Sequence, residues 1–405
     1  MIGVDKLVVS INLAGIEVDL GELASSGRKI YFKYHSSFID RGIEISPFKM
    51  PLSEGILEVE HLPFDGLFGV FNDSLPDGWG RLLLDRTLFS RGISPTQITP
   101  LDRLSYVGTR GMGALIYRPE ISSSFEHENA LELDYLAEQM SHVLEGTSDE
   151  VLEELFDLGG SSGGARPKVF VGYNPETNQL VHGKEKLPEG FEHWIIKFSS
   201  SSDPSDMANI EYAYHKMALD TGIEMNPCRL FEGKSGKQYF GTKRFDRVGG
   251  NRVHMHSGSG LMHDNFRLST MDYGNLMDCA FKLENHVGAY DKILRLAAFN
   301  VFSYNRDDHS KNFSFLMDEK GEWQVAPAYD LTFSSSSHGF HSTMVAGESK
   351  RPGKKHLFEL AEYFGMKKPN QVIEKVRDVI LKWNIYAQDY GVGATSTNLI
   401  AKTIG

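Results

Sequence analysis

Cysteine is scarce in this chain, which has only Cys228 and Cys279 among its 405 residues. Two widely separated thiols build neither a disulfide framework nor a cysteine-based zinc site, and they are typical of a reducing compartment. Long apolar runs are missing as well, because the most apolar late stretch, 293–304, is short and contains Arg295 and Asn300. We therefore expect a cytosolic protein without a membrane partner.

The N-terminus lacks the apolar core of a signal peptide, since Asp5 and Lys6 precede its apolar stretch and Glu17 and Asp19 follow soon after. Positive charge is also in short supply: 42 Lys and Arg against 54 Asp and Glu give a formal net charge of -12. Binding to nucleic acid without sequence preference depends on neutralising phosphates with Lys and Arg. We therefore expect any DNA contact to be indirect, through a partner protein.

With 40% hydrophobic and 24% charged residues, the composition is that of a globular protein. The length of 405 residues predicts two or three packed units. Partial alternation of β-branched and aromatic residues at 7–20 and 29–39 predicts a hairpin or meander. A helix is expected over 81–89, with Ser74 or Asp77 as its cap.

A second β-rich unit is expected between about 160 and 247, after helical spacing at 126–157. Its predicted strands are 169–173, 193–198 and 238–245, and its embedded helix is capped by Asp206 and ended by Gly222. Helical patterns then dominate at 290–304, 369–383 and 384–402, with a strand signal only around 313–325. This order predicts an α+β fold of two lobes with a cleft, divided into a small β-rich unit (1–120), a second β-rich unit (121–250) and a mainly helical lobe (251–405).

The pattern with the most chemical content is NRDDHSKNFSF at 305–315, followed by APAYDLTFS at 326–334. Phosphoryl transfer to a hydroxyl needs an aspartate that accepts or orients the proton, and carboxylate and amide oxygens that hold Mg²⁺. Asp307, Asn312 and Asp330 supply these groups in the order and spacing of protein kinases. The alternative is a set of turn and capping residues, and the sequence does not decide whether Asp307 or Asp308 faces the substrate.

The sequence defines the roles of two further polar residues in this segment, Lys311 and His309, less closely than those of the aspartates and Asn312. Lys311 either stabilises charge on the transferring phosphoryl group or neutralises the aspartates. His309 has no second histidine at metal-ligand spacing, so we expect it to form hydrogen bonds within this 305–315 loop. We count it among the candidate nucleotide contacts and give it no catalytic role.

Lys197 ends the apolar strand HWIIKF, where a buried ammonium group needs an anionic partner. Kinases use such a lysine on the α- and β-phosphates of ATP, and the alternative is a lysine that reaches solvent from an edge strand. Glu211 lies at the edge of the apolar stripe of the following helix. It is the predicted carboxylate partner of Lys197.

Glycines and serines in SSGGARPK at 161–168 can surround a phosphate with backbone N–H groups, which makes Ser161, Ser162, Gly163, Gly164 and Ala165 candidate nucleotide contacts. The run matches neither GxxxxGK[ST] nor GxGxxG, so a simple turn is the alternative, although Arg166 and Lys168 add positive charge. TKRFDR at 242–247 ends the third strand, where the backbone of a kinase hinge binds adenine. This segment is therefore a candidate for the adenine contacts.

Six segments together resemble the HipA family of serine/threonine kinases, which are toxins of bacterial toxin–antitoxin pairs: NDSLPDGWGRLLLDR at 72–86, SSGGARPK at 161–168, IIKF at 195–198, KRFDR at 243–247, DDHSKNFS at 307–314 and PAYDL at 327–331. The resemblance runs in order through nearly the whole chain. It implies a protein-kinase-like fold and an ATP- and Mg²⁺-dependent activity, with Asp307 as catalytic base, Asn312 and Asp330 on Mg²⁺, and Lys197 on the phosphates. It also assigns the adenine contacts to Lys243, Arg244 and Phe245. The chain departs from the family at Lys243, where a glutamate is expected, and at Arg306, where a small residue is expected.

The resemblance also implies autophosphorylation of Ser161, with Ser162 as the alternative. A phosphate there adds about two negative charges to a loop that faces ATP, so loss of the loop from the site and self-inactivation follow. The implied partners are a protein substrate, namely an aminoacyl-tRNA synthetase, and a small helix-turn-helix antitoxin that binds operator DNA. Two rival functions are a small-molecule or lipid kinase of the same fold and a catalytically idle regulator that binds an antitoxin.

Overall fold

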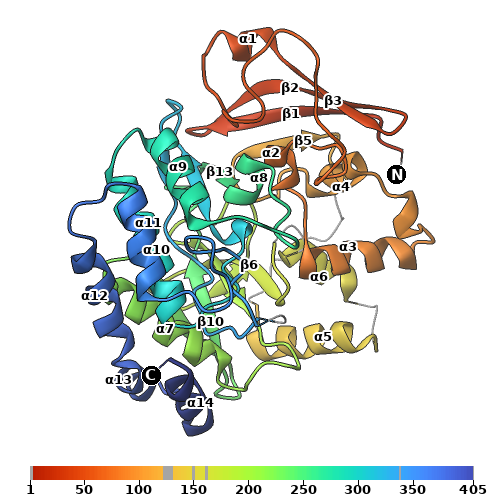
Figure 1. Cartoon of the computed structure of the whole chain (residues 1–405). Helices are drawn as coiled ribbons and strands as arrows, with labels where there is room; N and C mark the ends of the chain where they lie inside the picture. Colours follow the sequence, from red (N-terminus) through yellow and green to blue (C-terminus); the bar gives the residue numbers. More distant parts are fainter. Residues whose placement is uncertain (1–2, 122–130, 148–150, 160–162, 337–338, 405) are drawn as a thin grey trace.

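The computed structural model describes residues 3–121, 131–147, 151–159, 163–336 and 339–404. Figure 1 shows the N-terminal sheet at the top, a second sheet near the centre, and the C-terminal helices at the left and bottom. This succession of β-rich parts and then helices confirms the predicted α+β class. The unit boundaries at 120 and 250 stay a prediction. No helix in the described ranges is both long enough and apolar enough to span a bilayer.

The N-terminal sheet is antiparallel and has the order β4-β3-β2-β1-β5. Its strands are β1 (Lys6–Leu13), β2 (Ile16–Ser26), β3 (Lys29–Tyr34), β4 (Leu57–Glu58) and β5 (Leu115–Arg118). The predicted hairpin turns at Ala14 and Gly15, whose φ angles of +50° and +86° are both positive, as a tight turn between twisted strands requires. Alternate residues of β1, among them Leu7, Val9 and Ile11, are fully buried because one face of the sheet covers a core.

Short helices connect this sheet to the rest of the chain: α1 (Ser36–Ile39), α2 (Gly69–Asn72), α3 (Gly78–Ser90), a 3₁₀ turn η1 (Pro95–Gln97) and α4 (Pro100–Val107). The helix expected over 81–89 is α3. Asp77 occupies the N-cap position of α3, as one of the two predictions had it, but its side chain forms no hydrogen bond to the first turn. Ser74 accepts instead from the Tyr117 hydroxyl at 2.7 Å. The helical spacing at 126–157 corresponds to two helices, α5 (Leu133–Glu145) and α6 (Leu152–Gly159).

The second sheet is also antiparallel, in the order β7-β6-β8-β10-β9. Its strands are β6 (Lys168–Tyr173), β7 (Leu180–His182), β8 (Glu192–Lys197), β9 (Cys228–Glu232) and β10 (Gln238–Lys243). Between β8 and β9 runs α7 (Met207–Thr221), which ends at Gly222 with a left-handed φ of +89°. Asp206 occupies the predicted N-cap position of α7, but its carboxylate does not bond to the first turn and accepts instead from the Gly393 amide and the Ser396 hydroxyl near the C-terminal end of the chain.

The C-terminal half packs helices around α10 (Gly288–Phe302), the apolar helix expected before the catalytic motif. Its other elements are β11 (Arg247–Val248), β12 (Asn251–Arg252), β13 (His254–Ser257), α8 (Gly258–Met262), α9 (Tyr273–Glu284), η2 (Ser310–Asn312), β14 (Ser314–Met317), β15 (Trp323–Val325), α11 (Lys354–Tyr363), α12 (Pro369–Ile380), α13 (Trp383–Asp389) and α14 (Ala394–Ile404). The strand β13 was not predicted, because HMHS has little β-branched or apolar character. It becomes a strand by pairing with β14, so its residues lie beside the end of the 305–315 segment.

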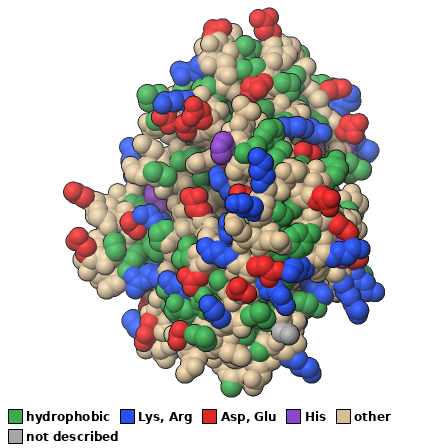
Figure 2. Space-filling model, turned by 60° about the vertical axis from the view of Figure 1, so that its left-hand side comes forward, with side chains coloured by type: hydrophobic (Ala, Val, Ile, Leu, Met, Phe, Trp, Pro, Cys, Tyr) green, Lys and Arg blue, Asp and Glu red, His purple; other side chains and the backbone are tan. Residues whose placement is uncertain are grey.

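On the face shown in Figure 2, basic and acidic side chains are interspersed instead of gathered into one basic surface. Such a mixed surface agrees with the net charge of -12. On this face the side chains therefore give no support to direct binding of a nucleic-acid backbone.

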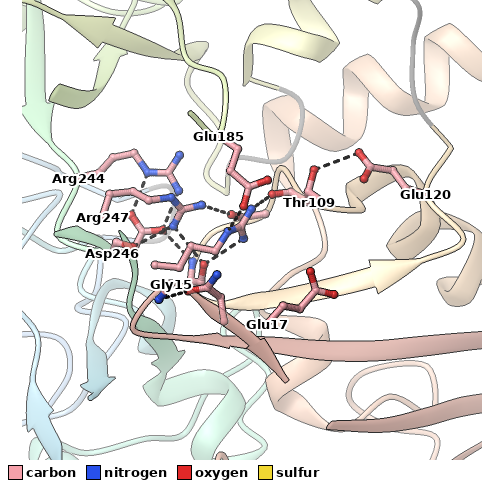
Figure 3. A network of polar contacts seen from close by, with 12 residues as sticks. Gly15, Glu17, Thr109, Glu120, Glu185, Arg244, Asp246 and Arg247 are labelled. Carbon is pink, nitrogen blue, oxygen red and sulfur yellow. Dashed lines mark hydrogen bonds and ion pairs between the residues drawn. The ribbon is translucent and has the colours of Figure 1, made fainter. Parts of the chain in front are cut away.

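A buried polar network joins the N-terminal part to the second sheet (Figure 3). The fully buried Asp246 carboxylate accepts from Arg244, from Arg247 and, at 2.8 Å, from the Gly113 amide. Arg247 donates onward to the carbonyls of Gly111 and Gly113, each at 3.1 Å. Burial would raise the pKa of Asp246, but the two guanidinium groups outweigh it and hold that pKa well below the usual range.

We expect an Asp246→Asn substitution to lower the free energy of unfolding by about 3–5 kcal/mol, because it leaves buried arginines without their counter-charge. Urea denaturation at neutral pH measures this loss. Glu185→Gln is the matched control, since Glu185 pairs with Arg252 at 3.1 Å but its side chain is 43% exposed, and it should cost at most about 1 kcal/mol. Because the folded-state pKa of Asp246 is depressed, its contribution is present above the unfolded pKa of about 3.9 and is lost as the pH falls below that value. Equal losses for both variants would contradict this account.

Candidate active site

A cavity of about 1260 Å³ lies between the second sheet and the loops that follow α10. Every predicted site residue in the described ranges lines it, namely Gly163, Gly164, Ala165, Lys197, Glu211, Lys243, Arg244, Phe245, Asp307, His309, Lys311, Asn312 and Asp330. Ser161 and Ser162 lie outside the described residues. The volume exceeds the roughly 300–1000 Å³ of ordinary small-molecule pockets. The cavity therefore has room for a nucleotide and part of a second substrate.

The two adjacent aspartates of the 305–315 segment have different surroundings. Asp308 is buried and accepts from the Tyr273 hydroxyl at 2.9 Å, from the Ser342 amide at 2.8 Å and from His341 Nδ1 at 3.0 Å. The Asp307 side chain is 61% exposed and faces the cavity. The choice left open by the sequence is therefore resolved by packing: Asp308 anchors the loop and Asp307 points to the site.

The surroundings of Asp307 favour its protonated form. The cavity walls reduce its solvation and so raise its pKa, the Asp330 and Asp308 carboxylates raise it further, and His309 opposes them. A carboxylate with a raised pKa is a better proton acceptor than an ordinary aspartate. The geometry and the charge environment both suit Asp307 to general-base chemistry.

Asn312 and Asp330 present oxygen atoms to the same cavity. The Asn312 amide nitrogen donates to the Asp307 carbonyl at 2.7 Å, which leaves its oxygen for a cation. Asp330 has a left-handed φ of +53°, and although burial would raise its pKa, Lys197 and Lys168 outweigh that effect and hold the pKa well below the usual range. An ionised carboxylate and an amide oxygen fit Mg²⁺, which keeps water or phosphate oxygens as its remaining ligands. Consistent with such a sparse set, the described ranges contain no cluster of three His, Cys, Asp or Glu side chains arranged around a metal.

Lys197 lies between two carboxylates, and its ammonium group contacts both Glu211 and Asp330. The strand β8 supplies the lysine and the helix α7 supplies Glu211, so the predicted pair comes together. The side chains of Lys197 and Glu211 are only 12% and 5% exposed. Burial would lower the pKa of Lys197, but the two carboxylates outweigh it and raise the pKa, so the lysine stays charged.

Positive charge gathers beside the glycine-rich segment. Lys168 is buried and donates to the Gly163 carbonyl at 2.5 Å, and burial lowers its pKa. Arg166 binds Asp203 at 2.9 Å and lines the cavity. Arg166, Lys168 and Lys197 line the same cavity as the backbone of Gly163 and Gly164, a combination that suits a polyphosphate.

The predicted adenine segment is partly engaged within the fold. The Lys243 amide donates to the Pro227 carbonyl and the Arg244 amide donates to the His193 carbonyl, each at 2.9 Å. The Arg244 side chain is held by Asp246. Lys243, at the position that departs from the family, forms an ion pair with Glu192 at 2.7 Å.

One expectation for the 305–315 loop needs correction. His309 was expected to form hydrogen bonds within the loop, but its buried Nδ1 has no partner among the described residues. Its Nε2 lies 3.9 Å from Asp307, too far for a hydrogen bond, and the ring packs against Phe266 with 5.1 Å between centroids. Of the two roles left open for Lys311, neutralising the neighbouring aspartates is not favoured, because its ammonium group lies 2.6 Å from Asp77.

Sequence reasoning missed two carboxylates that line this cavity, Asp73 and Asp77. Asp73 accepts from His256 Nδ1 at 2.7 Å and from the Ser257 amide and hydroxyl at 2.7 and 2.6 Å. Both lie in NDSLPDGWG just before α3, where aspartates are typical helix caps. The local pattern therefore pointed to capping, and only the packing of this segment against distant loops reveals their partners.

The second sheet carries a buried lysine–glutamate pair, and the helical half carries an Asp-x₄-Asn loop followed by a further aspartate. Together these features define a two-lobed protein-kinase-like fold.

Comparison with known proteins then identifies the family. Residues 160–383 match the HipA-like C-terminal domain and residues 12–118 match the HipA N-terminal domain. The chain belongs to the HipA family, as the resemblance implied.

Individual relatives are distant. The serine/threonine-protein kinase toxin HipA of Shewanella oneidensis is 30% identical over 95 residues, which are 23% of this chain and 22% of the relative. The solved complex of HipA, HipB and operator DNA from Shewanella oneidensis MR-1 contains a chain with a TM-score of 0.67 and 17% identity, over 98% of this chain and 94% of that one. That similarity establishes a shared fold over nearly the whole chain.

Proposed function

We propose that this chain is an ATP- and Mg²⁺-dependent serine/threonine protein kinase that acts as the toxin of a toxin–antitoxin pair. The observation that carries the proposal is the convergence of Asp307, Asn312 and Asp330 on one cavity, with Asp330 in contact with the Lys197–Glu211 pair. The family supports the same reaction, since its Shewanella oneidensis relative is named a serine/threonine-protein kinase toxin.

Each residue has a role in the proposed reaction. Lys197 and the Gly163 amide bind the phosphates of ATP, and the backbone of Arg244 and Phe245 meets the adenine. Asn312 and Asp330 hold Mg²⁺, which when bound neutralises charge on the phosphates. Asp307 accepts the proton of the substrate serine as its oxygen bonds to the γ-phosphorus, the bond to the β,γ-bridging oxygen breaks, and ADP leaves with the electron pair. Lys311 stabilises negative charge on the phosphoryl group in transit.

We propose that the partners are a protein substrate, an aminoacyl-tRNA synthetase, and a helix-turn-helix antitoxin, all in the cytoplasm. The similar fold of a chain in the solved complex of HipA, HipB and operator DNA supports an antitoxin partner. The net charge of -12 supports DNA contact through that partner and not directly.

Incubation of the purified chain with γ-³²P-labelled ATP, Mg²⁺ and a bacterial lysate tests the activity. We expect label on the chain itself and on a small number of lysate proteins. Label confined to small molecules would favour the small-molecule kinase, and no transfer in combination with antitoxin binding would favour the idle regulator.

We also propose that Ser161, with Ser162 as alternative, is the site of autophosphorylation. After incubation with Mg–ATP, peptide mass spectrometry should place the phosphate in the segment 161–168, and Ser161→Ala should remove it. The phosphorylated chain should bind ATP at least about tenfold more weakly, because two added charges repel the nucleotide and one tenfold step is only about 1.4 kcal/mol. Phosphate found solely outside this segment would contradict the assignment.

A further inference from the structure

The segment between α2 and α3 reaches from the N-terminal part into the cavity. The Asp77 carboxylate there accepts a hydrogen bond from the backbone amide of Gly164, and its other oxygen lies 2.6 Å from the ammonium group of Lys311. The side chains of Asp77 and Lys311 are only 13% and 14% exposed. One carboxylate thus connects the glycine-rich segment to the catalytic loop.

The backbone around Asp77 is shaped for this contact. The Trp79 amide donates to the Gly164 carbonyl at 3.0 Å. A Cβ atom on Gly78 would lie 2.3 Å from that carbonyl oxygen, and Gly78 has a φ of +45°, so only glycine allows the two chains to approach this closely. The start of α3 therefore forms a fitted backbone contact with the glycine-rich segment.

The charge on Asp77 is compatible with a permanent ion pair. Burial would raise the pKa of Asp77, but Lys311 outweighs it, and the Gly164 amide and Lys168 lower the pKa further. The carboxylate is therefore ionised at neutral pH. Because water is largely excluded, the pair with Lys311 is stronger than a pair on the surface.

We propose that Asp77 is a positioning residue of the kinase reaction, by which the N-terminal part completes the nucleotide site. It holds the Lys311 ammonium group where the γ-phosphate is transferred, and its bond to the Gly164 amide fixes the backbone of Gly163 and Gly164 beside the phosphates. Lysine has a long side chain and glycine has the least restricted backbone, so fixing both in advance removes an entropic cost from the reaction. The inference rests on the proposed function, because it places Lys311 and the Gly163–Gly164 backbone beside the ATP phosphates.

Two substitutions separate the contacts of Asp77. Asp77→Asn retains an oxygen for the Gly164 amide but removes the charge from Lys311, so kcat should fall about 10- to 100-fold while KM for ATP changes less than about threefold. Asp77→Ala removes both contacts, so KM for ATP should rise about tenfold in addition. Steady-state kinetics with varied Mg–ATP measure both constants, and thermal unfolding reports stability.

Asp206→Asn is the matched control. Asp206 also precedes a helix without capping it and also binds distant groups, Gly393 and Ser396, and it does not line the cavity. We expect it to lower stability but to leave kcat and KM unchanged. Should Asp77→Asn fail to fold, Asp77→Glu serves instead, because it retains the charge for Lys311 and loses the fit to Gly164, so KM for ATP should rise while kcat stays within about threefold.

A double-mutant cycle with Lys311→Met completes the test. If Asp77 acts through Lys311, adding Asp77→Asn to Lys311→Met should lower kcat by less than about threefold. Additive losses, or parent-like kcat and KM in Asp77→Asn, would overturn the inference while leaving the kinase proposal intact. A parent protein that neither binds Mg–ATP nor transfers phosphate would overturn both.

Discussion

An Asp307→Asn variant is expected to transfer phosphate at least about 100-fold more slowly than the parent, because general-base catalysis contributes about 10²–10⁴-fold. Asparagine has nearly the same shape but accepts no proton at neutral pH. The Asp307 side chain is 61% exposed, so the variant should fold normally and bind Mg–ATP with the affinity of the parent. Single-turnover transfer of labelled phosphate, together with calorimetric titration of Mg–ATP, separates the chemical step from binding.

Asp308→Asn is the informative comparison. Asp308 is buried among Tyr273, His341 and Ser342, so its substitution should lower the free energy of unfolding by about 1–3 kcal/mol or more. Asp307→Asn should therefore lower the rate of phosphate transfer, whereas Asp308→Asn should lower the free energy of unfolding. Asp307→Asn with the transfer rate of the parent would remove the base from the mechanism.

The pH profile of the parent offers an independent view of Asp307. Its pKa is raised by weak solvation and by the nearby carboxylates of Asp330 and Asp308. A base must be deprotonated to act, so kcat should fall on the acidic side, with a midpoint above the ordinary aspartate value of about 3.9. The residual activity of Asp307→Asn should lack this acidic limb.

A Lys197→Met variant should have the second large effect. Removal of the ammonium group takes a charged donor from the ATP phosphates, and a hydrogen bond to a charged group is worth about 1.5–3 kcal/mol, or roughly 10- to 150-fold in affinity. It also leaves the Glu211 and Asp330 carboxylates facing each other without their shared cation. Without that cation the two negative charges attract a divalent ion more strongly, so Mg²⁺ binding at Asp330 should be retained while the affinity for ATP falls.

Calorimetric titration with ATP at several Mg²⁺ concentrations measures both effects. Lys216→Met is the control, because Lys216 is carried by the same helix as Glu211 but lies over the Tyr212 ring and does not line the cavity. It should bind Mg–ATP as the parent does. Unchanged affinity in Lys197→Met would mean that the lysine serves the fold and not the nucleotide.

The candidate site could be predicted from sequence wherever its chemistry follows from a local pattern. Lys197 and Glu211 were paired because one ends an apolar strand and the other borders the stripe of the next helix, and the structure brings them into contact. The order of Asp307, Asn312 and Asp330 likewise follows from spacing within one loop and one hairpin. Periodicity and spacing act over a few residues, which is the range that a sequence displays directly.

Other features depended on contacts between distant segments. Asp77 looked like a helix cap, yet it binds Gly164 and Lys311, which are 87 and 234 positions away. His309 looked like a hydrogen-bonding loop residue, yet its ring lies against Phe266. Which of Asp307 and Asp308 faces the cavity depended on which carboxylate is buried among hydrogen-bond donors of the C-terminal half. A carboxylate has the same local signature in each of these settings, and its surroundings differ only after the chain has folded.

The amino-acid order alone was thus sufficient for the α+β class, the family and a set of candidate residues that line one cavity, because strand and helix periods and short motifs are local properties. Folding assigned the roles within that set: it turned Asp307 toward the cavity, buried Asp308, and placed an aspartate of the N-terminal part against the glycine-rich segment. The physical reason is that charge, solvation and hydrogen-bond partners of a side chain depend on neighbours brought together from remote parts of the chain.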